Sequence, residues 1–177
     1  MVRRPLCLLA LFACASLLHA DPGNPAIDAE AYLTGAVEAM KYRSTHRIPE
    51  DEFLRLRREP STIVLDARSR EKFELLHVDG AINLPLPEVD PESLARLLPD
   101  KHARILIYCN NNFDGDPMAF MRKKMSVSLN LLTFTTLYEY GYRNVYELEP
   151  LIGVDETLLP LVGLQTELTP VGNGDRP

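Results

Sequence analysis

The chain has 177 residues, with 19 Lys or Arg, 25 Asp or Glu and a formal net charge of −6. This length suffices for one domain with a proper hydrophobic core. The acidic balance argues against nucleic acid or an anionic membrane as a general partner, so an anionic substrate has to be attracted by local positive charge.

The first twenty residues have the parts of a secretory signal peptide. Arg3-Arg4 forms a positive start, residues 6–18 are apolar, and His19-Ala20 offers a cleavage site. We therefore expect residues 1–20 to be removed and the product to be exported, into the periplasm if the source is bacterial. The remaining 157 residues carry a charge of −8, because the leader holds two basic residues and no acidic one.

A lipoprotein interpretation of the leader stays open. Leu11-Phe12-Ala13-Cys14 has the form of a lipobox with Cys14 as the acylated residue, although Phe12 is bulky and the apolar run continues to Leu18. No later segment approaches the roughly 20 apolar residues that span a bilayer, so we expect no membrane span. The absence of an Asn-x-Ser/Thr acceptor argues against a glycosylating secretory route.

Helices and strands are expected to alternate along the mature chain. Residues 21–45 are predicted to form an N-terminal extension, whose helix covers residues 28–42. Short apolar runs predict strands at 63–65, 81–84, 104–109 and 144–148. Capping residues and apolar spacing predict helices after Pro49, after Ser69, from Asp90 to Leu98 and at 128–140. The pattern indicates an α/β fold with a mostly parallel sheet of about five strands and helices on both faces.

The C-terminal segment, residues 151–177, is predicted to be an extension of the domain. Residues 150–169 are expected to form one more short helix, and a disordered tail is expected from about residue 171.

After removal of the leader, Cys109 is the only cysteine. It closes the run Arg104-Ile105-Leu106-Ile107-Tyr108-Cys109, at the carboxyl end of a predicted strand, where ligands bind in open α/β sheets. A lone cysteine either packs in the protein interior, pairs with another molecule or acts as a catalytic group. A buried free cysteine is commonly just a small hydrophobe, so position alone leaves both interpretations open.

Four segments in register resemble rhodanese-like domains, the sulfurtransferase family. They are Leu65-Asp66-Ala67-Arg68-Ser69-Arg70-Glu71-Lys72-Phe73, His77-Val78-Asp79-Gly80-Ala81-Ile82-Asn83-Leu84-Pro85, Leu106-Ile107-Tyr108-Cys109 and Tyr140-Gly141-Tyr142-Arg143-Asn144-Val145-Tyr146-Glu147-Leu148. The resemblance covers roughly residues 46–150. It implies the three-layer rhodanese fold, with Cys109 as the residue that carries a persulfide and no cofactor.

The chain departs from the family after the cysteine. An insertion at about residues 113–126 lengthens the segment between Cys109 and the following helix, and the sequence Tyr-Cys-Asn-Asn-Asn-Phe resembles that of an exported subgroup. The sixth position after the cysteine is Gly115, where related phosphatases and arsenate reductases have Arg, so that activity is not expected. Asp116-Pro117 predicts a short helix that reaches Met125.

The resemblance and the residue types together suggest a site. Because only a thiolate attacks sulfane sulfur, the loop Asn110, Asn111, Asn112 and Phe113 is expected to bind an anion beside Cys109. The carboxylates of Asp114 and Asp116 disfavour a thiolate and an anionic donor at this loop. If the insertion folds back, their negative charge is offset by Arg122, Lys123 and Lys124.

Three further polar residues near the site receive predictions. Arg68 either anchors the end of the sheet, which we favour, or binds substrate. His77 is predicted to satisfy a turn, and Asp66 to cap local backbone. No Cys/His/Asp cluster has the spacing of metal ligands, so no metal is expected.

Two functions follow. The first is a sulfurtransferase that forms a persulfide on Cys109, taking sulfur from thiosulfate or another persulfide and passing it to a thiol acceptor or a partner protein. The second is a catalytically silent rhodanese-like module that docks a partner through residues 113–126, where Met118, Phe120, Met121 and Met125 form an apolar ridge. The sequence leaves the oligomeric state undetermined.

Overall fold

The computed structural model describes residues 24–168, which fall into two units, one ending at Thr34 and one beginning at Gly35. In the first unit, the carboxylate of Asp28 accepts a hydrogen bond from the Ala31 N–H (2.8 Å) at the start of helix α1, Ala29–Arg43. This helix lies one residue from the predicted 28–42. The predicted leader and the predicted C-terminal tail lie outside the described residues. No helix within 24–168 combines the length and apolarity that crossing a membrane requires.

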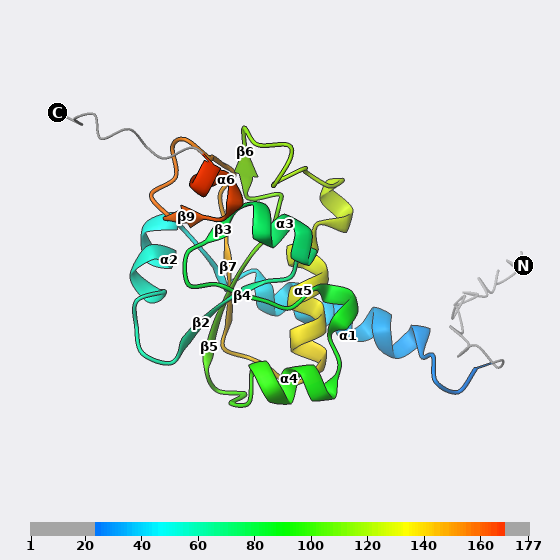
Figure 1. The fold of residues 1–177 in the computed structure, drawn as a ribbon. Helices are drawn as coiled ribbons and strands as arrows, with labels where there is room; N and C mark the ends of the chain where they lie inside the picture. The colour runs from blue at the N-terminus through cyan, green and yellow to red at the C-terminus, as the bar shows by residue number, and fades with distance from the viewer. Residues whose placement is uncertain (1–23, 169–177) are drawn as a thin grey trace, which may run out of the picture. The chain divides into compact units, whose positions relative to one another are not determined.

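A five-stranded parallel sheet forms the centre of the second unit (Figure 1). Its strands, in spatial order, are β1 Arg47–Ile48, β7 Val145–Leu148, β5 Arg104–Tyr108, β2 Thr62–Asp66 and β4 Ile82–Asn83. The α/β prediction with a mostly parallel sheet of about five strands is therefore confirmed.

Helices cover both faces of this sheet. They are α2 Glu50–Leu56, α3 Arg70–Leu75, α4 Pro91–Leu97 and α5 Leu129–Glu139, with short 3-10 helices η1 Leu86–Glu88 and η2 Met125–Val127. Helix α4 begins as its sequence predicts: Asp90 and Ser93 form a reciprocal capping box before Pro91.

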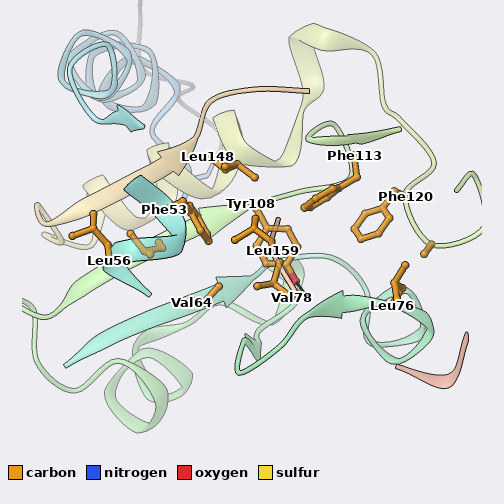
Figure 2. Close-up of a cluster of buried hydrophobic side chains, with 12 residues drawn as sticks. Phe53, Leu56, Val64, Leu76, Val78, Tyr108, Phe113, Phe120, Leu148 and Leu159 are labelled. Atoms are coloured by element: carbon orange, nitrogen blue, oxygen red, sulfur yellow. Dashed lines mark hydrogen bonds between the residues drawn. The ribbon is translucent and has the colours of Figure 1, made fainter. Parts of the chain in front are cut away.

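Alternate side chains of the strands build two separate cores. Leu106 and Tyr108 of β5 pack with Phe53 of α2 on one face, where Figure 2 shows the cluster. Ile105 and Ile107 point the other way and pack with residues of α4 and α5. This alternation is the two-residue period of a β-strand, and it leaves the carboxyl end of β5 between the two layers.

Two small strand pairs complete the fold. Strand β3 (His77–Val78) pairs antiparallel with β9 (Leu161–Val162), and β6 (Phe113–Asp114) pairs parallel with β8 (Ile152–Gly153). Helix α6, Leu164–Leu168, follows.

The segment 150–169 does contain one short helix, the five-residue α6, but two short strands that were not predicted, β8 and β9, precede it. These strands form two small separate sheets, with β3 and with β6, and Gly163 allows the segment to approach the backbone of Leu75 closely. A Cβ at Gly163 would lie 2.6 Å from the carbonyl oxygen of Leu75. Glycine is thus required where this segment crosses the end of α3.

Candidate functional site

The sulfur of Cys109 lies at the carboxyl edge of the sheet, directly after β5, and only 1% of the residue is exposed. The backbone N–H of Asn111 donates to Sγ at 3.3 Å, and the hydroxyl of Ser128 lies 3.5 Å from it. The backbone N–H of Asn130 also faces the sulfur. Because Ser128 and Asn130 flank the first residue of α5, the sulfur lies at the N-terminus of an eleven-residue helix.

The surroundings of Cys109 push its pKa in two directions. Burial raises the pKa of the thiol and dominates, while Ser128, Asn111 and Asn130 lower it by donating hydrogen bonds. The charge of Glu147, which forms a partly buried ion pair with Arg43 of α1, raises the pKa of Cys109 further. Near neutral pH the sulfur is therefore held as a thiol, with donors in place around it.

The Ser128 hydroxyl offers a direct test of this arrangement. Replacing Ser128 with Ala removes a donor that favours the thiolate, so the pKa of Cys109 rises further. At a fixed pH below that pKa, alkylation of Cys109 by iodoacetamide should slow about tenfold, because a hydrogen bond to a charged group contributes about 1.5 kcal/mol. The rate should recover at higher pH. Ser126→Ala, on the exposed side of the same segment, is the control; equal rates for both variants would contradict the role of Ser128.

Asn112 holds the main chain of the thiol loop. Its Oδ1 accepts from the Cys109 N–H and from the side chain of Asn130, both at 2.9 Å. Its Nδ2 donates to the carbonyls of Leu148 (2.8 Å) and Pro150 (3.0 Å). All of its amide donors and acceptors are used within the protein, so Asn112 positions the loop.

Asn110 and Asn111 tie the insertion to the loop. The amide of Asn110 donates to the carbonyl oxygen of Met121. The side chain of Asn111 pairs with the backbone of Lys123 through two hydrogen bonds of 2.9 and 3.0 Å. Of the four residues predicted to bind an anion, the main chain of Asn111 is therefore the part that contacts the sulfur.

Phe113 lies in the core and not on a substrate-facing loop. It belongs to β6, is fully buried, and its ring centroid lies 5.9 Å from that of Tyr108 and 4.6 Å from that of Phe120 (Figure 2). Removing the apolar ring from water stabilises the fold, so Phe113 belongs to the core and does not contribute to an anion-binding loop.

The helix predicted from Asp116 to Met125 is wrong. Asp116 does cap the N–H groups of Met118 and Ala119, both at 2.9 Å, but this makes a single turn. Phe120 then enters the core, which draws the chain out of a helical path. The helix N-terminus beside the sulfur is that of α5.

Arg68 is buried, and hydrogen bonds to a carboxylate and to two backbone carbonyls hold its guanidinium. Its guanidinium contacts both carboxylate oxygens of Asp66 at 2.6 to 3.0 Å and donates to the carbonyls of Ala119 (3.0 Å) and Leu76 (2.7 Å). It also lies 4.3 Å from the ring centroid of Phe120. These contacts join β2, α3 and the insertion, which agrees with the anchoring role favoured from the sequence.

Tyr108 completes this buried network and was missed in the sequence analysis. Its hydroxyl donates to Asp66 (2.6 Å) and accepts from the N–H of Val78 (3.0 Å), and burial raises its pKa strongly. The signal available was a tyrosine in a strand otherwise made of aliphatic residues. His77 makes a local turn contact as predicted, with Nδ1 2.7 Å from the carbonyl oxygen of Phe73.

A pocket of about 550 Å³ opens beside the thiol loop. Asn110, which follows Cys109, and Leu129, which follows Ser128, line it, so one side of the pocket is made by immediate neighbours of the reactive group. Further lining residues come from the loops after β2 and β4, and Arg68 is one of them. The insertion does fold back, since Arg122 and Lys123 also line this pocket.

The profile of the Rhodanese-like domain matches residues 49–149. The thiosulfate sulfurtransferase PspE of Escherichia coli (strain K12) is 46% identical over 46 residues, which cover 26% of this chain and 43% of that protein. The chain thus matches less than half the length of this curated relative.

Solved structures give similar results. A structure described as rhodanese with anions from E. coli has 29% identity and a TM-score of 0.39, covering 58% of this chain and 98% of its own. The rhodanese-like domain of the Anabaena sp. Alr3790 protein has 22% identity and a TM-score of 0.47, covering 75% and 89%. With the family profile matching more than half of its length, the chain belongs to the rhodanese-like domain family.

Proposed function

We propose that the chain is an exported sulfurtransferase that carries sulfur as a persulfide on Cys109. The observation that carries the proposal is the position of Sγ, at the carboxyl edge of the sheet and facing the N–H groups of Asn111 and Asn130 and the hydroxyl of Ser128. Such donors stabilise negative charge on sulfur. The relationship to PspE, named as a thiosulfate sulfurtransferase, supports the same activity.

The reaction has two steps. The thiol of Cys109 first loses its proton to solvent, and the thiolate attacks the outer sulfur of thiosulfate. The S–S bond of thiosulfate breaks, sulfite leaves with the electron pair, and Cys109 holds a persulfide. An acceptor thiolate then attacks the outer sulfur, and the Cys109 thiolate is released.

Burial sets a requirement for the first step. Because the thiol is shielded and its pKa is raised, attack needs the loop or the insertion to admit the donor. The side chains of Asn110 and Asn111 make only three hydrogen bonds with the insertion, and the two from Asn111 are exposed, so this segment is the one we expect to move. Two buried amide oxygens beside the thiol, on Asn110 and Asn130, have no partner among residues 24–168, which lowers the cost of that movement.

Export is part of the proposal. It depends on the signal-peptide pattern of residues 1–20, and the mature N-terminus, read by mass spectrometry, checks it. A start at Asp21 supports cleavage, while an acylated Cys14 supports the lipoprotein interpretation.

Mass spectrometry of the protein treated with thiosulfate tests the activity. We expect a gain of about 32 Da, one sulfur atom, that is located on Cys109, disappears on treatment with a thiol and is absent in Cys109→Ser. Sulfite should be released in equal amount. A folded protein that gains no sulfur at any pH up to the pKa of Cys109 would contradict the proposal and support the silent module.

A further inference from the structure

Glu147 is a buried carboxylate that lies one strand away from the reactive sulfur. It belongs to β7, where it pairs with Ile107 of β5, two residues before Cys109. Only 4% of Glu147 and 1% of Cys109 are exposed. Side chains alternate along a strand, and Ile107 and Val145 both pack in the core on the α5 side of the sheet. Because Cys109 and Glu147 each follow by two residues, their side chains point to that same side.

Arg43, in the last turn of α1, supplies the counter-charge for Glu147. Its Nε and Nη2 donate to the two carboxylate oxygens of Glu147. Packing holds this end of α1 in place, since Ala39 is fully buried and Met40 and Tyr42 pack against the core on the α5 side. The family profile begins only after β1, so Arg43 comes from a helix outside the matched domain.

The remaining groups near this pair differ from it in charge. Three neutral donors face the sulfur of Cys109, from Ser128, Asn111 and Asn130. His46 is a titratable neighbour of Glu147, because its carbonyl accepts the Glu147 N–H, and its ring stacks on that of Tyr42 with 4.1 Å between centroids. The balance between Arg43 and Glu147 therefore sets the local field of full charges beside the thiol.

This balance acts on the sulfur through the protein interior, where little water lies between charges to screen them. A carboxylate without a partner disfavours a thiolate nearby, and a matched one does so far less. We infer that Arg43 is a positioning residue of the thiol site: by neutralising Glu147 it allows the sulfur of Cys109 to ionise. Reactivity thereby depends on a helix outside the matched domain. The inference rests on the proposed sulfurtransferase activity for its functional meaning, but ionisation of the thiol is measurable without that activity.

The pH profile of Cys109 alkylation by iodoacetamide tests the inference, recorded above the range in which free histidine titrates. Glu147→Gln leaves Arg43 unmatched and should move the midpoint of the profile down by about half a pH unit, which is about a threefold change in rate at a fixed pH below it. Arg43→Gln leaves Glu147 unmatched and should move the midpoint up by about the same amount. The double variant should return close to the midpoint of the unchanged protein.

The opposite directions separate an electrostatic role from a structural one. Loosening of the fold would expose the thiol, and both single variants would then move towards the value of a free thiol, about 8.5. Shifts in one direction, or an unmoved midpoint in Glu147→Gln, would overturn the inference. If Arg43→Gln does not fold, Arg43→Lys replaces it. The lysine keeps the charge and loses the bidentate contact, so an unmoved midpoint supports the electrostatic role and any shift overturns it.

An exposed ion pair provides the matched control. Arg47 of β1 and Glu149, which follows β7, lie 3.2 Å apart with 36% and 48% of their side chains exposed. Water screens such a pair, so Arg47→Gln and Glu149→Gln should each leave the midpoint unchanged. Shifts as large as those of the Arg43 and Glu147 variants would show that any nearby charge has the same effect, and would overturn the specific role of Arg43.

Persulfide formation from thiosulfate supplies the second readout. At a fixed pH below the midpoint its rate should follow the same order, fastest in Glu147→Gln and slowest in Arg43→Gln. If the alkylation midpoints follow this order but no sulfur is gained, the role of Arg43 stands and the proposed activity fails. If Cys109 gains sulfur while the midpoints of all variants are equal, the proposed activity stands and this inference fails.

Discussion

Replacing Arg68 with Met is expected to destabilise the protein by about 3 to 5 kcal/mol, the usual effect of removing one partner of a buried ion pair. The change leaves the fully buried carboxylate of Asp66 and the carbonyls of Leu76 and Ala119 without the guanidinium. In thermal unfolding followed by circular dichroism, the midpoint should fall by about 10 °C.

Two control variants separate anchoring from substrate binding at Arg68. Arg68→Lys keeps the charge but loses the planar fork that contacts both Asp66 oxygens, so it should be destabilised as well. The double variant Asp66→Asn with Arg68→Met removes both charges and should recover part of the lost stability. An Arg68→Met protein of unchanged stability that bound thiosulfate more weakly would instead support the substrate-binding role.

The second large effect is expected at Asn112. Changing Asn112 to Ala removes the buried partners of the Cys109 N–H and the Leu148 carbonyl, and the part-buried partner of the Pro150 carbonyl. Buried polar groups without partners cost about 1 to 3 kcal/mol each, and these effects are not fully additive, so we expect a loss of about 3 to 5 kcal/mol. Persulfide formation should fall with it, because the loop that presents Asn111 N–H to the sulfur loses its support.

Asn111→Ala is the matched control for that experiment. The side chain of Asn111 makes its two hydrogen bonds near the surface, where water replaces them, so the loss should be about 1 kcal/mol. Urea unfolding of the two variants provides the comparison. Equal losses of unfolding free energy would show that the hydrogen bonds of Asn112 stabilise the loop no more than those of Asn111.

The sequence predicted those elements that have a strong local signal. The run Arg104 to Cys109 predicted β5, and Asp90-Pro91 predicted the start of α4. Both predictions succeeded because a buried strand and a helix cap are recognised from residues that are neighbours in the sequence. The two-residue strands β3, β6, β8 and β9 carry no periodicity. Their pairing depends on contacts between residues far apart, such as Phe113 with Ile152, so the sequence predicted none of them.

The same distinction applies to the site. Cys109 was singled out because a strand end is a local pattern, whereas the donors Ser128 and Asn130 lie at the start of α5, 19 or more residues further along the chain. Asn112 was assigned to anion binding because an Asn-rich loop permits it. Its contacts with Leu148 and Pro150, 36 and 38 residues away, could be known only from the fold.

The burial of Cys109 has a consequence for the lifetime of the protein. Peroxide attacks thiolates, and repeated attack converts cysteine through sulfenic and sulfinic acids to the irreversible sulfonic acid. A sulfur that is protonated and buried is shielded from this damage, while Met118, Met121 and Met125 on the surface of the insertion are exposed to it. Oxidative damage would therefore strike these methionines first, and their sulfoxides are reversible products.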